Sequence, residues 1–306
     1  TVTDTGSVDS ADLNTINGVT SGLVTATGVA TINGTASAIT TLIGNEGTSG
    51  DKVALDGDFA MTVSSGTATV DQANTMAAFS TSGAITATIS DQTIAALDDL
   101  TTSNSDQLTI TVASTSATAA QLTTVAGATG LNVTATAVET VTGTATEMDA
   151  LLAAEGTTGD KINLDADYAI TISGSNATVT QANAYGAATD GVVTATISNT
   201  AVADLDDLTT ANTDLLSITM AAQNVTAAQL ITINGATGST VNATAVTGIT
   251  GTAAQFESVM DAEGATGDKI NLDTDFTANV TNGTTTAAQL AKIDAKTSKN
   301  VDASLV

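Results

Sequence analysis

One stretch of this chain occurs three times, as EGTSGDKVALDGDF at residues 46–59, EGTTGDKINLDADY at residues 155–168 and EGATGDKINLDTDF at residues 263–276. The offsets between successive copies are 155 − 46 = 109 and 263 − 155 = 108. Another stretch, ATIS, recurs at residues 87–90 and 195–198 with the same offset of 108. Near-identical copies at a fixed period predict a repeat architecture rather than an ordinary globular domain.

Each repeat block divides into four shorter segments with a strand, a helix start and a short helix. The strand is an alternating stretch such as VTATA at residues 133–137, with apolar residues on one face and Thr on the other. The helix carries an apolar stripe, such as Ala119, Leu122 and Val125, and usually ends at Gly. The helix start is a Thr followed three residues later by Gln or Glu, the spacing of a capping box. This spacing occurs at Thr69/Gln72, Thr118/Gln121, Thr144/Glu147, Thr178/Gln181, Thr226/Gln229, Thr252/Gln255 and Thr286/Gln289.

Counting the helix starts gives eleven segments, near Asp9, Thr35, Thr69, Thr93, Thr118, Thr144, Thr178, Thr200, Thr226, Thr252 and Thr286. A helix of about ten residues is marginal alone, but stacked copies bury its apolar face. Strands that are linked by helices run parallel, with right-handed crossovers. The sequence therefore predicts a repeat solenoid: a right-handed parallel β-solenoid with one strand and one short helix in most coils. This α/β solenoid would have about eleven coils, four coils per block.

The repeat pattern also predicts the domain organisation and the core. We expect residues 1–306 to form a single continuous array, made of a partial block 1–86, the blocks 87–194 and 195–302, and a partial end 303–306. The residues expected in the core are Leu122, Leu151, Leu230 and Leu290 between helix and sheet, and the in-phase aromatics Phe59, Tyr168 and Phe276.

Composition excludes several classes of function. The chain has 306 residues, a formal net charge of −26, six lysines, and no arginine, histidine or cysteine. Such a chain repels polyanions, so we expect no nucleic-acid partner. No run approaches the roughly 18 apolar residues of a membrane span, so we expect no membrane insertion. The abundant Ser and Thr lack a histidine base, so we expect no enzyme activity and neither catalytic nor cofactor-binding residues.

The repeated acidic stretch is the best candidate for a metal site. Three carboxylates at the spacing D-x4-D-x-D around a turn could supply oxygen ligands to a hard cation such as Ca²⁺. The candidate ligands are Asp51, Asp56, Asp58, Asp160, Asp165, Asp167, Asp268, Asp273 and Asp275. The spacing does not match an EF-hand. The alternative interpretation is that these aspartates cap turns and face solvent.

Threonine pairs at i and i+2, such as Thr134/Thr136 and Thr194/Thr196, recur in the predicted strands. In a stacked parallel sheet they would form two columns, an arrangement that is similar to the flat face of ice-binding solenoids. The alternative is that Thr is a favourable outward-facing strand residue that keeps the sheet soluble.

The two ends of the chain are candidate assembly surfaces, because the first and last strands of a solenoid have unpaired edges. The strand-like ends carry no proline, and the last helix is rich in lysine in an otherwise acidic chain. The candidate assembly residues are Thr1, Val2, Thr3, Lys292, Lys296, Lys299, Val301 and Val306. We expect copies to join head to tail, or flanking repeats of a longer chain to continue the stack. Ordinary sequence drift in a solvent-facing helix would also explain the lysines.

Two stretches resemble a known class of repeats: TAAQLTTVAGATGLNVTATAVETVTGTATEMDALL at residues 118–152 and TAVADLDDLTTANTDLLSIT at residues 200–219. They are similar to the tandem repeats of very large secreted proteins of marine bacteria, notably the giant cell-surface proteins of marine cyanobacteria. The resemblance implies export to the cell surface, a saline, calcium-rich setting and a structural role. We therefore expect a rod or filament segment of a bacterial surface fibre, surface layer or adhesin. The alternatives are a ligand-binding array, for ice or glycan, and a phage fibre shaft.

Overall fold

The computed structural model describes the chain in two compact units. The first compact unit contains Thr1–Glu139 and Ala150–Asp165, and the second contains Thr140–Asp149 and Ala166–Val306. The described residues are 1–159, 161–281 and 284–303, so Asp160 and Val306 lie outside them.

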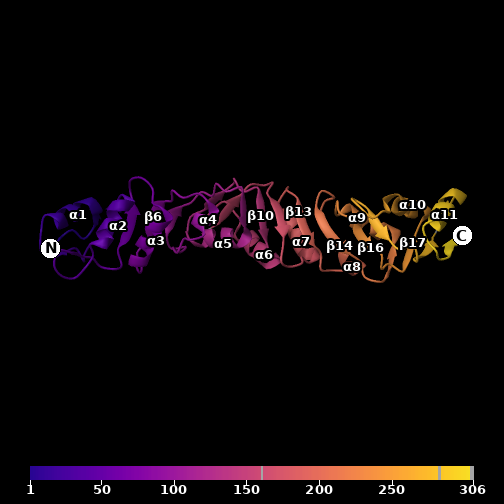
Figure 1. Ribbon diagram of the computed structural model, residues 1–306, viewed down its shortest axis with the longest axis horizontal. Helices are drawn as coiled ribbons and strands as arrows, with labels where there is room; N and C mark the ends of the chain where they lie inside the picture. Colours follow the sequence, from indigo (N-terminus) through magenta and orange to yellow (C-terminus); the bar gives the residue numbers. More distant parts are fainter. Residues whose placement is uncertain (160, 282–283, 304–306) are drawn as a thin grey trace. The chain divides into compact units, whose positions relative to one another are not determined.

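Short helices and short strands alternate along the chain, as can be followed in Figure 1. The helices of the first compact unit are α1 (Ser10–Gly18), α2 (Ala36–Gly44), α3 (Val70–Phe79), α4 (Ile94–Leu97) and α5 (Ala119–Gly127). Those of the second are α7 (Val179–Ala188), α8 (Val202–Leu205), α9 (Ala227–Gly235), α10 (Ala253–Ala262) and α11 (Ala287–Asp294). Helix α6 (Ala145–Ala154) contributes residues to both.

The strands are two to five residues long. In the first compact unit they are β1 (Ser7–Asp9), β2 (Val24–Thr25), β3 (Thr31–Gly34), β4 (Val53–Ala54), β5 (Ala60–Val63), β6 (Ile85–Thr88), β7 (Gln107–Thr109), β8 (Ser116–Thr118), β9 (Val133–Ala135) and β11 (Ile162–Leu164). In the second they are β10 (Thr140–Gly143), β12 (Ala169–Ile172), β13 (Val193–Thr196), β14 (Leu215–Thr219), β15 (Asn224–Thr226), β16 (Val241–Ala243), β17 (Gly248–Gly251), β18 (Ile270–Leu272), β19 (Thr277–Val280) and β20 (Val301–Ala303).

The sheets are parallel, as the sequence predicts for strands that are linked by helices. In the first compact unit the strand order is β1-β3-β5-β6-β7, with the smaller pairs β2-β4 and β9-β11. In the second, β10-β12-β13-β14-β16-β18 follow one another, and β15-β17-β19-β20 form a separate sheet. Parallel sheets alternating with helices make this an α/β fold, which is consistent with a solenoid.

The prediction of one strand per segment is wrong for most segments. Two strands separate most successive helices of the described chain, as β9 and β10 separate α5 from α6. The amide of Val138 donates to the carbonyl of Ala135 (3.1 Å) and turns the chain between them. Val133, Ala135, Val138 and Val141 are all buried, so the apolar alternation shifts phase at this corner. Between successive helices of the described residues, a single strand occurs only before the short helices α4 and α8.

The predicted helix starts are confirmed. At the start of α5, the hydroxyl of Thr118 accepts from the amide of Gln121 (3.2 Å), and the Gln121 side chain accepts from the amide of Thr118 (3.1 Å). The same reciprocal pair of bonds occurs at all seven predicted capping boxes. Helix α8 is the exception to the predicted positions, because its N-cap is Ala201 rather than Thr200 and makes no side-chain bond. Each capping box contributes about 1 kcal/mol to helix stability.

The core lies between the helices and the sheets and matches the predicted residues with one exception. Leu122, Leu151 and Leu230 have no exposed surface, and Phe59, Tyr168 and Phe276 are at most 2% exposed. Leu290 of α11 is only half-buried, so its predicted burial is wrong. The equivalent leucines are covered from both sides along the stack, whereas no described helix follows α11.

Candidate functional site

The repeated motif E-G-x-x-G-D-K forms a tight loop after three of the helices. In the third copy, Gly267 has a φ of +77°, a left-handed conformation that favours glycine. The amide of Gly264 donates to the carbonyl of Ile270 (3.0 Å), so the loop closes onto the strand that follows it. The equivalent glycines of the other copies, Gly50 and Gly159, have φ values of +73° and +71°. The glycines therefore recur because of backbone geometry.

The lysine of this motif closes the preceding helix. The ammonium group of Lys161 donates to the carbonyl of Ala153 in α6 (2.7 Å), and that of Lys269 donates to the carbonyl of Asp261 in α10 (3.1 Å). A Cβ on Gly264 would lie 3.1 Å from Cγ of Lys269, so the glycine makes room for the lysine stem. A cation at the negative end of a helix dipole is stabilising. The motif therefore acts as a helix C-cap.

The aspartates of the candidate metal site lie at the surface. All of the described ones are exposed: Asp51, Asp56, Asp58, Asp165, Asp167, Asp268, Asp273 and Asp275. Asp56 accepts from the amide of Gly57 (2.8 Å), and Asp273 accepts from the amide of Thr274 (2.6 Å). Asp268 accepts from the side-chain amide of Asn234 (2.8 Å). Within the described ranges, no three acidic side chains converge as a metal site requires. The calcium site thus stays a prediction, and Asp160 lies outside the described residues.

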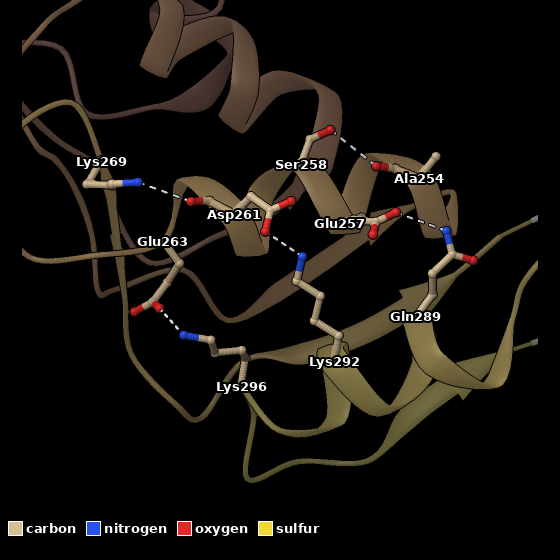
Figure 2. A network of polar contacts seen from close by, with 9 residues as sticks. All are labelled: Ala254, Glu257, Ser258, Asp261, Glu263, Lys269, Gln289, Lys292 and Lys296. Atoms are coloured by element: carbon tan, nitrogen blue, oxygen red, sulfur yellow. Dashed lines mark hydrogen bonds and ion pairs between the residues drawn. The ribbon is translucent and has the colours of Figure 1, made fainter.

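The lysines at the C-terminal end pair with the preceding helix, as Figure 2 shows. The ammonium group of Lys292 lies 2.5 Å from the carboxylate of Asp261, and Lys296 pairs with Glu263. The side-chain amide of Gln289 donates to the carboxylate of Glu257, which also lies in α10 (3.1 Å). These contacts join α11 to α10 and the loop after it, so two of the three lysines already have partners within the chain.

Of the remaining described assembly residues, only Val301 lies in a strand; Thr1, Val2 and Thr3, which were expected to form one, precede β1 and belong to no strand. Val2 donates its amide to the carbonyl of Thr25 (2.7 Å), next to the exposed Thr1 and Thr3. Val301 lies in β20 and is half-buried, whereas Lys299 is exposed and forms no ion pair with any described residue. Val306 lies outside the described residues.

Sequence reasoning missed a set of buried hydroxyls that tie neighbouring segments together. The hydroxyl of Thr237 accepts from the amide of Leu216 (2.9 Å) and lies 3.0 Å from its carbonyl. Thr129, at the equivalent position of the preceding block, makes the same two contacts with Leu108, at 2.9 Å each. Both threonines are fully buried. Each of these threonines follows a capping threonine by 11 residues, since 129 − 118 = 11 and 237 − 226 = 11. This constant spacing is the sequence signal that could have identified the buried hydroxyls.

Two buried aspartates take part in the same cross-segment bonding. Asp214 is 4% exposed, and its two carboxylate oxygens accept from the amides of Val193 (2.8 Å) and Ala211 (3.0 Å). Asp106 is 6% exposed and is bound in the same way in the first compact unit, by Ile85 and Ser103. In both carboxylates each oxygen accepts a hydrogen bond from a backbone amide, so these buried groups have partners within the fold.

Two pKa shifts have structural causes. The hydrogen bond from the backbone amide of Thr144 lowers the pKa of Glu147 in its capping box, and the hydroxyl of Thr144 adds to this effect. Burial raises the pKa of Tyr185 well above its usual range, and its hydrogen bond to Asp149 (3.0 Å) raises it further. Neither group is poised to exchange a proton near neutral pH.

The outward column of strand residues is mixed rather than a uniform threonine array. In the first compact unit the residues in register are Asp9, Asn33, Thr62, Thr86 and Gln107. In the second they include Thr142, Thr171, Thr194 and Leu215. The ice-binding alternative gains no support from these columns.

Comparisons with known proteins add no identification: no family model, no curated protein and no solved structure matches this chain. Across the part of the chain that the structure describes, every helix is too short or too polar to span a bilayer.

Proposed function

We propose that this chain is a structural, non-enzymatic segment of an extracellular bacterial surface fibre, surface layer or adhesin. In this proposal residues 1–306 form one array, a right-handed parallel solenoid of about eleven coils with four coils per block. The supporting observation is that buried polar side chains form hydrogen bonds between neighbouring segments of the repeat. Thr129 and Thr237 make the same contacts in successive blocks, and each contact joins one coil to the next.

A structural role is supported over catalysis by how the buried polar groups are used. The carboxylates of Asp106 and Asp214 both accept backbone amides. The loop lysines Lys161 and Lys269 cap helices. These carboxylates and lysines make the same backbone contacts in successive blocks, which favours a structural role. Catalytic side chains would instead need to be available to a substrate at one local site.

The extracellular assignment is supported by the resemblance to giant surface-protein repeats and by the net charge of −26. A strongly acidic surface keeps a repeat chain soluble and disfavours nucleic acid and anionic membranes as partners. The proposed partners are therefore flanking repeats of a longer chain or further copies of this one. Antibody labelling of intact, unpermeabilised cells of the source organism tests the location, and labelling only after permeabilisation would reject it.

The solenoid is tested by duplicating one block. A chain that contains residues 195–302 twice should gain four coils, and its maximum dimension in small-angle X-ray scattering should grow by about 19 Å, or four parallel-strand spacings of about 4.8 Å. Duplicating residues 87–194 instead should give the same increment. Two duplications that increase the dimension by unequal amounts, or that leave it unchanged, would reject a continuous solenoid.

A further inference from the structure

A small polar hollow lies between two loops of the first compact unit. One loop, residues 80–84, joins α3 to β6, and the other, residues 98–106, joins α4 to β7. The hollow has a volume of about 140 Å³. A cavity of about 150 Å³ holds a benzene ring, so this hollow has room for one small ligand with a six-membered ring. The residues of the two loops that matter for binding are Ser82, Thr101, Ser103, Ser105 and Asp106.

Asp106 is the buried charged group of this hollow. It is 6% exposed, and its two oxygens accept from the amides of Ile85 (2.8 Å) and Ser103 (2.9 Å). An ionised carboxylate has about four acceptor positions, so the two amides do not exhaust it. Among the described residues that line the hollow, Asp106 alone carries a charge. A ligand at this place therefore has to donate a hydrogen bond to Asp106.

Hydroxyl groups surround this carboxylate. Those of Ser82 and Thr101 are exposed and form no hydrogen bond with any described residue. Those of Ser103 and Ser105 lie 2.7 Å apart, and either can donate to the other. A hydroxyl both donates and accepts. The hollow thus combines one acceptor with several groups of both kinds, which matches a ligand that carries several hydroxyls of its own.

The second compact unit shows that the fold does not require a serine at position 103. Asp214 is the equivalent of Asp106, and its carboxylate accepts from the amide of Ala211 (3.0 Å) as Asp106 accepts from that of Ser103. Ala211 occupies the position of Ser103, since 211 − 103 = 108. Alanine holds the carboxylate equally well, so the hydroxyl of Ser103 is available for another purpose.

The loop that contains Ser82 also differs between the two blocks. Ser80 and Thr189 are equivalent, because their hydroxyls donate to the carbonyls of Phe59 (3.1 Å) and Tyr168 (2.5 Å). Strand β6 begins five residues after Ser80, whereas β13 begins four residues after Thr189. The longer loop adds a residue to the rim of the hollow and presents the hydroxyl of Ser82. The first compact unit therefore carries two serine hydroxyls here that the repeat itself does not need.

We propose that this hollow binds one monosaccharide ring, either as a free sugar or as the end of a glycan chain. A ring hydroxyl donates to the carboxylate of Asp106, and Ser82, Thr101 and Ser103 bind the neighbouring ring hydroxyls. A calcium ion fits less well, because it takes six to eight oxygen ligands and the hollow offers one carboxylate that already accepts two amides. The site lies within the first compact unit, so the inference depends neither on the solenoid nor on where the protein is located.

Nuclear magnetic resonance titration of the full chain tests the site. The probes are D-glucose, D-galactose and D-mannose and their methyl glycosides, at up to about 50 mM, well above the Kd of about 1–10 mM that is expected for a small polar ligand. The amide signals of Ser82 and Ser103 should shift with at least one of these sugars. Binding of a free sugar but not of its methyl glycosides identifies a soluble monosaccharide. Binding of a methyl glycoside identifies the end of a glycan chain.

Two variants each remove one hydroxyl of the site. Thr101→Ala and Ser103→Ala should each weaken sugar binding about three- to tenfold, because one hydrogen bond to the ring is lost. Ser103→Ala introduces the residue that the second block carries, so its fold should be unchanged. The matched control is Thr209→Ala, at the exposed equivalent of Thr101 in the second block (209 − 101 = 108), and it should leave the affinity unchanged.

The proposal is overturned if none of these sugars shifts the amides of Ser82 and Ser103. It is also overturned if methylammonium or Ca²⁺ shifts them and no sugar does, since the hollow then binds a cation. Equal affinities of wild type, Thr101→Ala and Ser103→Ala would place the sugar elsewhere, as would a loss of affinity in Thr209→Ala. The block-duplication measurement is independent, so a chain that binds no sugar but lengthens by the expected step retains its structural role.

Discussion

Removing one buried hydroxyl should test whether the cross-segment bonds stabilise the fold. The substitution is Thr237→Val, which keeps the shape of the side chain and removes its oxygen. That oxygen accepts from the amides of Leu216 (2.9 Å) and Ser239 (3.1 Å), and it lies 3.0 Å from the Leu216 carbonyl. The site is fully buried, so water cannot replace the lost partner at Leu216.

The expected cost follows from the groups that lose a partner. The buried Leu216 amide loses its acceptor, which costs about 1–3 kcal/mol. The Ser239 amide is only partly buried and can bind water, so its loss adds about 0.5–1 kcal/mol. The methyl group of valine fills nearly the same volume, so a cavity term is small. The free energy of unfolding should therefore fall by about 1.5–4 kcal/mol.

Urea unfolding, followed by circular dichroism, measures the change, and amide hydrogen exchange at Leu216 localises it. The matched control is Thr196→Val, the same substitution at an exposed position of β13, which should change stability by less than about 0.5 kcal/mol. Thr129→Val should repeat the full effect in the first compact unit, because Thr129 makes the equivalent contacts. If Thr237→Val costs no more than the control, the buried hydroxyl does not stabilise the fold.

Further outcomes test the loops, the core, the acid response and the metal. Gly267→Ala should destabilise the fold by about 1–2 kcal/mol, because alanine disfavours a φ of +77°; Gly127→Ala, in helix α5 with nothing within 4 Å, should not. Leu122→Ala should cost about 2–5 kcal/mol and Leu290→Ala clearly less, since only the former is fully buried; equal losses in thermal melts would contradict this. The pKa of Glu147 is lowered on folding, so its contribution is present above the pKa of the unfolded chain and is lost as pH falls through the folded pKa. Glu147→Gln should therefore flatten the acid limb of a stability–pH curve, and an unchanged limb would contradict the cause assigned to the shift. Thermal melts in millimolar Ca²⁺ and in chelator at matched ionic strength should differ if the acidic stretch binds the ion, and identical melts would reject a structural site.

Local signals explain why the helix starts were predictable. A capping box depends on two side chains three residues apart, such as Thr118 and Gln121, and on their own backbone. The spacing can therefore be found without knowing the partner segments. The repeat adds the parallel order of the strands, because each helix separates two of them.

The corner at Val138 was missed because the alternation of small residues continues through it. Residues 133–137 alternate as one strand would, yet Ala135 accepts from the amide of Val138 and ends β9. The Ala and Val side chains on both sides of this turn are similar in size. The residue types around Val138 therefore do not predict the turn.

Partners far along the chain were also beyond the sequence. The buried Thr129 and Thr237 differ from the many surface threonines only in the neighbouring segments that pack against them. Lys292 pairs with Asp261, 31 residues earlier, only because α11 stacks on α10 in one register. A single sequence shows residue types but does not show that register. The aspartates of the acidic stretch were recognisable as a repeated pattern, but their separation at the surface depends on the loop geometry.

The short separations of the hydroxyl contacts have a consequence for how the chain acquires its fold. Thr237 and Leu216 are 21 residues apart, as are Thr129 and Leu108. Contacts between residues this close in sequence form with little loop-closure entropy. Each new helix can therefore dock as soon as it leaves the ribosome, on segments made moments before. Synthesis and folding would then advance together from the N-terminus, and a long chain would expose only its most recently made stretch to proteases and to aggregation.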